Sequence, residues 1–207
     1  MCSRFENKET GQSIFEKFDK DYFGNFILDE TEELKKIAIA PTNDITIIRM
    51  EEGMYKIQKS QWGIKFDDDP KKPLIFNSRI ETIIQKNYWS RLFNNNRCLI
   101  PVTAFYEWKS SGTKKIPQRI SLDTEYLFFI LGIFAVVQGT VMSSLITTEP
   151  NEFMKPVHNR MPAITTYDKS LDFLNSTSDI ALSMCRPFEY GDLMNIQIAD
   201  DLVKKKI

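Results

Sequence analysis

The N-terminal stretch Met-Cys-Ser-Arg-Phe carries an unusual chemical possibility, because Cys2 directly follows the initiator methionine. Aminopeptidases usually remove methionine before a small residue such as cysteine. Removal of Met1 would leave Cys2 with an α-amine and a thiol on adjacent carbons, a pair that no internal residue offers. Reference pKa values of about 7.7–8.0 for the amine and about 8.5 for the thiol give both groups a reactive form near neutral pH. The competing interpretation is a chance cysteine on a frayed terminus.

One carboxylate lies in an unusually apolar stretch, RCLIPVTAFYEWK, at residues 97–109. On a strand, Glu107 shares a face with Phe105 and is flanked by Tyr106 and Trp108. A buried carboxylate is costly unless it is paired or protonated, so Glu107 is a candidate acid or base. An edge strand with an exposed face explains the residue equally well.

The chain has a single histidine, His158, in the stretch HNRMPAI. It is the only ordinary proton shuttle near neutral pH, although a lone histidine is more often structural than catalytic. If the segment is extended, His158 and Arg160 point the same way. One histidine excludes a multi-histidine metal site, and no carboxylate or thiolate cluster has ligand spacing. We therefore expect neither a metal nor another cofactor.

Asn77 and Arg79 lie in FNSRIET, residues 76–82. In an extended segment they share a face, and a carboxamide beside a guanidinium suits the recognition of anions and oxygens. The competing interpretation is a strand end followed by a helix start, with Glu81 in the first turn, where carboxylates are favoured. The stretch TTEPN, residues 147–151, similarly resembles a strand end that runs into a helix cap.

The composition of the 207 residues limits the class of protein. Hydrophobic residues make up 42% and aromatic residues 12% of the chain, which is enough for a folded core. Since the net charge is −1, any binding to nucleic acid must come from a local basic patch. Three cysteines without zinc spacing and a polar, charged N-terminus predict a reduced, cytoplasmic protein without a signal peptide.

Strands dominate the elements that must position these residues. Residues 45–50 and 54–58 flank Glu51-Glu52-Gly53 as a predicted hairpin, and further strands are predicted over 97–101, 103–108 and 118–122. The apolar run 126–137 is too short to span a bilayer, so we expect no membrane partner. It is instead typical of a buried strand, which turns at Gln138-Gly139 into another strand.

Helices are predicted on both sides of these strands, over residues 8–18, 29–38, 79–93 and 169–174. The order of elements favours an α+β fold with a mixed, largely antiparallel, barrel-like β-sheet core flanked by helices. A doubly wound parallel sheet would need regular alternation of strands and helices, which the pattern lacks.

Taken in order, several motifs resemble those of the SOS response-associated peptidase (SRAP) family, whose members process abasic sites. The motifs are MCSRF, APTNDITIIR, WGI, PLIFNSRIET, RCLIPVTAFYEW and HNRMPAI. The resemblance covers about residues 2–174, and we expect residues 175–207 to be a C-terminal extension of the same single domain, residues 1–207.

The resemblance implies a protein of the DNA damage response that recognises abasic sites in single-stranded DNA. It implies removal of Met1 by an associated autoproteolytic peptidase activity, followed by a covalent thiazolidine crosslink between Cys2 and the DNA. A β-elimination lyase activity is a weaker expectation. We expect a cytoplasmic monomer that joins the nucleoid when it is on damaged DNA.

By their places in these motifs, the resemblance assigns roles to individual residues. The implied catalytic residues are Cys2, Asn77, Glu107 and His158. The implied DNA-binding residues are Arg4, Arg79, Arg160 and Trp62, with Trp62 as a stacking or wedge residue. Thr148, in the stretch TTEPN outside these motifs, is expected to bind DNA as well.

The sequence departs from the family pattern in several places. Ser3 and Ala104 replace glycines, and Ser78 replaces an alanine. In the loop KFDDDPKK, residues 65–72, an acidic run of Asp67, Asp68 and Asp69 stands where the family has a DNA wedge, and it would repel phosphate.

Two other functions are compatible with the sequence. An N-terminal-nucleophile amidohydrolase also begins Met-Cys, but it would want an Asn-Gly oxyanion element, and no asparagine here precedes a glycine. A non-catalytic single-strand binder would use the arginines and tryptophans alone and would not need Cys2.

Overall fold

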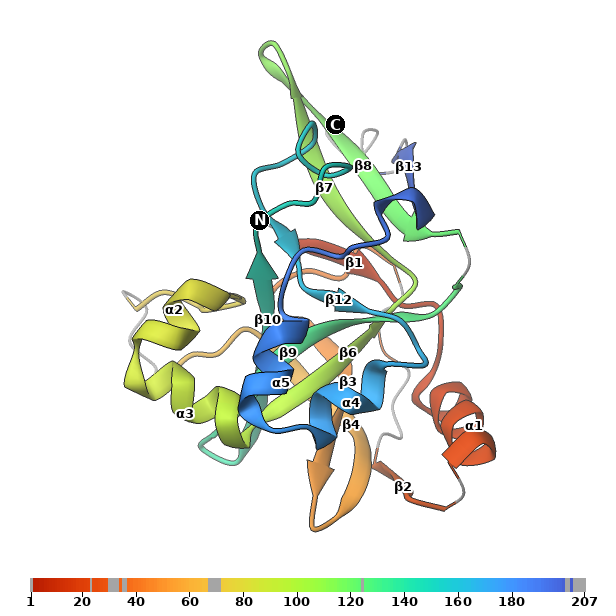
Figure 1. Ribbon diagram of the computed structural model, residues 1–207, viewed down its shortest axis with the longest axis vertical. Helices are drawn as coiled ribbons and strands as arrows, with labels where there is room; N and C mark the ends of the chain where they lie inside the picture. Colours follow the sequence, from red (N-terminus) through yellow and green to blue (C-terminus); the bar gives the residue numbers. More distant parts are fainter. Residues whose placement is uncertain are drawn as a thin grey trace.

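Five strands close into a β-barrel at the centre of the computed structural model (Figure 1). The structure describes residues 2–22, 24–29, 34, 37–66, 72–123, 125–199 and 202. Around the barrel the strands follow the order β10, β4, β3, β6 and β9, and β9 pairs with β10 to close it. Their bounds are β3 Asp44–Glu51, β4 Met54–Trp62, β6 Arg97–Val102, β9 Phe128–Val137 and β10 Thr140–Thr148.

The barrel sheet is mixed, because β4 and β10 run parallel while its other neighbouring pairs are antiparallel. Four short strands extend this sheet: β2 Phe26–Asp29, β5 Asn77–Arg79, β11 Met161–Pro162 and β12 Ile164–Thr165. A separate antiparallel sheet has the order β1 Arg4–Glu6, β7 Ala104–Ser111, β8 Lys114–Leu122 and β13 Met194–Ile198.

The two predicted hairpins of the barrel are confirmed. Residues Glu51 and Met54 pair across Glu52-Gly53, whose φ angles are 50° and 82°. Val137 and Thr140 pair across Gln138-Gly139, with φ angles of 50° and 79°. Positive φ at both central residues gives a turn whose twist matches that of the strands, so these short turns fix the register of both hairpins.

The apolar run of β9 forms a buried strand, as predicted, because both of its faces are covered. Phe128 and Ile130 belong to the hydrophobic cluster shared with β1, β7 and β8, whereas Phe129 and Leu131 belong to the cluster under the helices. A strand buried on both faces shows no alternation of polar and apolar residues. At Gly132 a Cβ would meet Ile100 Cδ1 at 2.8 Å and the Ser144 carbonyl at 3.2 Å, so a larger residue would need these neighbours to shift.

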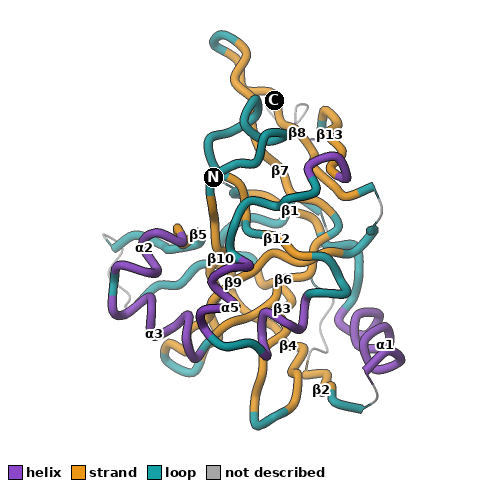
Figure 2. The backbone as a smooth tube through the Cα atoms, viewed as in Figure 1, coloured by secondary structure: helices purple, strands orange, loops and turns teal. Residues whose placement is uncertain are grey.

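The helices lie around the barrel and leave the β1–β7–β8–β13 sheet largely free of them, as Figure 2 shows. They are α1 Gly11–Tyr22, α2 Ile80–Gln85, α3 Asn87–Asn95, α4 Ser170–Asn175 and α5 Ser178–Met184, with a 3-10 turn η1 at Gly191–Leu193. Within the described part of the chain, no helix has the length and apolar character needed to cross a membrane.

The structure confirms the α+β class and corrects details of the helices. The single helix predicted over residues 79–93 is split at Lys86, whose backbone is extended with φ −111° and ψ 118°. Asp29 ends β2 instead of starting a helix, and most of the predicted helix 29–38 lies outside the described residues. The acidic run Asp67, Asp68 and Asp69 also lies outside them.

Candidate active site

The N-terminal strand places Cys2 beside β7. Arg4, Phe5 and Glu6 pair antiparallel with Tyr106, Phe105 and Ala104. Cys2 precedes this ladder and is 1% exposed, and its thiol donates a hydrogen bond to the carbonyl of Arg4 at 3.4 Å. Burial raises the pKa of the Cys2 thiol above its ordinary range, and the negative charge of Glu107 acts in the same direction. The thiol is therefore protonated at neutral pH and needs a base before it can attack.

Glu107 is the buried carboxyl group that the sequence singled out, and its side chain is 1% exposed. Burial raises the pKa of Glu107 to about 7, with the backbone of Trp108 opposing the shift. A group with such a pKa holds and releases a proton with similar ease near neutral pH, which suits general acid–base work. Of the two interpretations left open by the sequence, the structure supports burial and excludes an exposed edge position.

Asn77 reaches the same place from a different sheet. It starts β5, which runs parallel to β10 with Asn77 opposite Leu145. Its side-chain Nδ2 donates to the backbone carbonyl of Cys2 at 2.7 Å. Its Oδ1 is buried and has no hydrogen-bond partner among the described residues. A buried acceptor without a partner costs about 1–3 kcal/mol, and a ligand that donates a hydrogen bond there would recover it.

His158 lies in the turns that follow β10. Both backbone groups of Arg160 hold the ring, since its N–H lies 3.0 Å and its carbonyl 3.2 Å from His158 Nδ1. Burial lowers the pKa of His158 below its ordinary value, and the positive charge of Lys115 acts in the same direction. The imidazole is therefore neutral at pH 7 and can give or take a proton.

Arg160 is held by contacts inside the protein. Its guanidinium makes a two-pronged ion pair with Glu81 at 2.7 and 3.0 Å and donates to the carbonyl of Thr147 at 2.7 Å. The Arg160 hydrogen bonds lower the pKa of Glu81, so this carboxylate is ionised at neutral pH. With its side chain only 12% exposed, Arg160 joins β10 to the first turn of α2. A phosphate contact by this residue stays a prediction.

The other implied DNA contacts differ in how accessible they are. Arg79 is exposed at the end of β5, where a phosphate can reach it. Arg4 is partly buried and donates to the carbonyl of Ser3 at 2.6 Å, while Thr148 is buried. Their roles stay predictions.

The expectation that Trp62 stacks on a base needs correction. Its ring is 0% exposed, packs against Phe5 with 4.9 Å between centroids, and donates from Nε1 to the carbonyl of Phe76 at 2.9 Å. Trp62 ends β4, inside the layer between the barrel and the N-terminal strand. A ring with no accessible face cannot receive a base, so Trp62 supports the site from the core.

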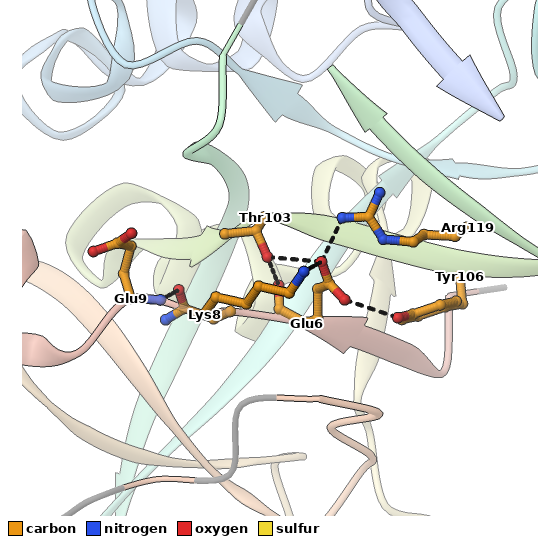
Figure 3. A network of polar contacts seen from close by, with 7 residues as sticks. Glu6, Lys8, Glu9, Thr103, Tyr106 and Arg119 are labelled. Carbon is orange, nitrogen blue, oxygen red and sulfur yellow. Dashed lines mark hydrogen bonds and ion pairs between the residues drawn. The ribbon is translucent and has the colours of Figure 1, made fainter. Parts of the chain in front are cut away.

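Sequence reasoning missed a buried polar network on β1, shown in Figure 3. The carboxylate of Glu6 accepts hydrogen bonds from Thr103 Oγ1 at 3.0 Å, from the Tyr106 hydroxyl at 2.9 Å and from the Arg119 guanidinium. Lys8 lies 3.5 Å from the same carboxylate. These contacts tie the strand that carries Cys2 to β7 and β8. Only the strand register brings the partners together, so no local sequence signal marks the network.

Glu6→Gln should destabilise the fold by about 3 kcal/mol at pH 7, because Arg119 would keep a half-buried charge without its carboxylate. Burial alone would raise the pKa of Glu6, but its hydrogen bonds to Arg119, Tyr106 and Thr103 outweigh burial and hold the pKa below the usual range. The stabilisation by this carboxylate is therefore complete above about pH 4.3 and is lost as the pH falls through the lower pKa of the folded state.

Urea unfolding from pH 7 to pH 3 measures this effect. The difference between wild type and Glu6→Gln should shrink at the acidic end, and Glu52→Gln, in an exposed turn, is the control. A difference that stays constant with pH would contradict the ion-pair explanation.

All three cysteines, Cys2, Cys98 and Cys185, are free and buried. No group of three or more histidine, cysteine or acidic side chains is placed to hold a metal ion in the described parts of the chain. The geometry brings Cys2 together with the Asn77 carboxamide and with Glu107, a carboxyl group of raised pKa, which suits proton transfer and nucleophilic chemistry. A catalytic role of His158 beside them stays a prediction.

Comparison with solved structures shows the same fold in two bacterial proteins. A protein from Bacteroides thetaiotaomicron superposes with a TM-score of 0.78 at 22% identity, covering 98% of this chain and 95% of that one. A protein from Bordetella bronchiseptica superposes with a TM-score of 0.77 at 18% identity, covering 96% and 99%.

Sequence comparison identifies the family. The abasic site processing protein YoaM of Bacillus subtilis is 33% identical over 211 residues, which cover 96% of this chain and 91% of the relative. The abasic site processing protein YedK of Escherichia coli is 22% identical over 197 residues, covering 90% and 88%. The model of the family described as SOS response associated peptidase (SRAP) matches residues 1–205. The chain therefore belongs to the SRAP family.

Proposed function

We propose that this protein recognises abasic sites in single-stranded DNA and crosslinks itself to them through Cys2. The names of its relatives point to abasic sites as the substrate. The observation that carries the proposal is the buried meeting of Cys2 with Asn77 and Glu107, since the carboxamide holds the Cys2 backbone at 2.7 Å and the Glu107 charge acts on its thiol.

The first step is removal of Met1. While Met1 is attached, the nitrogen of Cys2 is an amide and cannot attack a carbonyl. Hydrolysis of the Met1–Cys2 bond consumes one water, whose oxygen goes to the methionine carboxylate, and leaves a free α-amine on Cys2. We assign this cleavage to the same site, with Glu107 as the base that activates the water.

The second step is condensation with the DNA. An abasic deoxyribose in its ring-opened form exposes an aldehyde at C1′. The Cys2 amine adds to this carbon, and loss of one water gives an imine. The thiol sulfur then adds to the imine carbon while its proton passes to the imine nitrogen, and a five-membered thiazolidine closes. No oxidant or reductant is needed, and the closing step is intramolecular because amine and thiol belong to one residue.

The site residues have separate tasks in this scheme. Glu107 accepts the proton of the Cys2 ammonium, and its pKa of about 7 lies close to the amine's usual range. His158 donates a proton to the ring oxygen of the sugar as the ring opens. Asn77 fixes the Cys2 backbone and offers its buried Oδ1 to the amine or to a sugar hydroxyl. Arg79, exposed at the end of β5, contacts a flanking phosphate.

The raised thiol pKa favours this scheme over the amidohydrolase alternative. An amidohydrolase needs the thiol as its first nucleophile, and burial keeps the Cys2 thiol protonated. In the crosslinking scheme the amine attacks first, and the thiol is used only after the aldehyde is bound. Elimination from the imine would give a lyase side reaction if ring closure were slow. We further expect a monomer that acts in the cytoplasm, on the nucleoid when DNA is damaged.

Intact-mass measurement tests the proposal directly. The protein alone should lack the mass of one methionine residue. After incubation with a single strand that carries one abasic site, the product should have the summed mass of protein and DNA less one water. An intact strand of the same sequence should give no adduct. A protein that binds both strands and forms no adduct with either would instead be a non-catalytic single-strand binder.

A further inference from the structure

The hairpin of β7 and β8 extends beyond the site as a basic arm, which we define as residues 109–115. Figure 1 shows it projecting from the molecule past the N-terminus. All seven residues of the arm are exposed, and Gly112 turns it with φ +59°. The arm carries Lys109, Lys114 and Lys115 and no carboxylate. On a chain of net charge −1, this is a local concentration of positive charge.

One face of the arm continues the face of Glu107. Side chains alternate along a strand, so Lys109 and Ser111 lie on the same face of β7 as Glu107. Lys114 pairs directly with Ser111 across the hairpin and therefore lies on this face as well. At a rise of about 3.3 Å per residue, the two lysines stand about 7 and about 13 Å outward from Glu107. A DNA strand that leads outward from Glu107 along this face would pass both lysines.

The third lysine, Lys115, lies on the opposite face, and its charge acts electrostatically on His158. Lys115 pairs with Ser110, on the face that also carries Trp108. Its positive charge is one of the smaller causes of the lowered pKa of His158, so Lys115 lies within electrostatic range of that residue. The arm is therefore related to both proposed proton-handling residues. Glu107 lies on the same strand as Lys109, and the charge of Lys115 acts electrostatically on His158.

The lysines of the arm are not engaged by acidic side chains. None of them pairs with a carboxylate among the residues that the structure describes, whereas Arg160 is paired with Glu81 and Arg119 with Glu6. A lysine ammonium is a compact point charge that suits phosphate without reading the base.

We propose that the arm binds the sugar-phosphate backbone of the strand on one side of the abasic site. This inference rests on the proposed function, because it takes single-stranded DNA as the partner, and it adds where the flank of that strand runs. Phosphate contacts position the strand, so the arm guides the flank outward while the abasic sugar stays at Cys2. The contact is independent of base sequence and weakens with salt through counterion release.

Fluorescence anisotropy with a stable, non-reactive abasic analogue in a single strand tests the arm without crosslinking chemistry. The strands differ in the length of the 5′ flank or of the 3′ flank. Wild-type affinity should rise when one of the two flanks is lengthened, and Lys109→Gln/Lys114→Gln should lose that rise. The slope of log affinity against log salt should become shallower by about 1.4, since each single-strand phosphate contact contributes about 0.7.

Lys17→Gln/Lys20→Gln is the matched control, because it removes two exposed charges from α1, which Figure 1 places away from the arm. An arm variant that keeps the wild-type slope and flank dependence would overturn the proposal, as would a loss that is equal for every flank length. An acidic protein as the true partner would give the same unchanged DNA binding. Failure of the proposed function is a separate outcome, in which the wild type binds the analogue but forms no adduct with a natural abasic strand.

Discussion

A chain with one alanine inserted between Met1 and Cys2 will form no thiazolidine with an abasic strand. Processing of this chain leaves the free amine on alanine, and the Cys2 nitrogen stays in a peptide bond. Amine and thiol then belong to different residues, so the five-membered ring cannot close. The insertion precedes Arg4 and leaves the pairing of β1 with β7 in place, so the folded site is retained. A denaturing gel and intact mass should show complete loss of the stable adduct.

Cys2→Ser separates the two steps of the reaction. Its amine remains, but a hydroxyl closes the ring poorly, so the adduct should be an imine that survives on the gel only after reduction with borohydride. Anisotropy with the stable abasic analogue reports whether either altered chain still binds DNA. Equal crosslinking by the alanine-inserted protein would end the thiazolidine mechanism, whatever the behaviour of Cys2→Ser.

Glu107→Gln and His158→Ala should each slow crosslinking by about 10²–10⁴-fold, the usual effect of losing a general acid or base. They should differ in what rescues them. Glu107 serves the amine, so its loss slows attack on any aldehyde. His158 serves the sugar oxygen, so its loss matters while the deoxyribose is closed. A substrate that already presents an open-chain aldehyde should therefore restore His158→Ala far more than Glu107→Gln in single-turnover assays.

The pH dependence gives a second signature of Glu107. As a base it works when deprotonated, so wild-type rates should rise as the pH increases through about 7, the raised pKa of this carboxyl. Glu107→Gln should lack this rise and keep only the one due to the amine, near its usual pKa of about 7.7–8.0. Equal rescue of both variants by the open aldehyde would contradict the separate roles. If both variants crosslinked at the wild-type rate, Glu107 and His158 would have a structural role and no catalytic one.

The parts of the fold that the sequence predicts correctly are those with a local cause. The two-residue turns Glu52-Gly53 and Gln138-Gly139 each have glycine at the second position and set the pairing of the strands on either side. Glycine is favoured there because the backbone φ is positive, so the sequence marks these turns. The break at Lys86 has no such signal, because the apolar spacing of residues 80–92 continues across it. The β4–β10 pair that completes the barrel joins segments far apart in the sequence, Gln61–Trp62 and Met142–Ser143, and periodicity cannot predict such a pairing.

The site divides in the same way. The residue types at Cys2, Glu107 and His158 suggest chemistry on their own, and the burial of Glu107 could be argued from its apolar neighbours. The partners of the site residues could not be predicted from the sequence. Asn77 contacts Cys2, 75 residues away in the chain, and Arg160 contacts Glu81, 79 residues away. Trp62 shows the converse error, since an aromatic residue in a DNA-contact motif gives no indication that its ring is fully covered.

The short strand β1 also determines how the protein would bear mechanical load. In the proposed adduct, a force on the DNA enters the protein at Cys2, whose carbonyl Asn77 holds at 2.7 Å, and passes along the chain into three residues, Arg4–Glu6. These are held on one side by the ladder to β7 and on the other by the Phe5–Ile39 bridge, with the Glu6 network behind them. A polymerase or helicase that pulls on the strand would therefore peel β1 from its neighbours before it disturbs the barrel. The force that the adduct withstands is therefore set by how firmly β1 is attached and not by the stability of the whole fold.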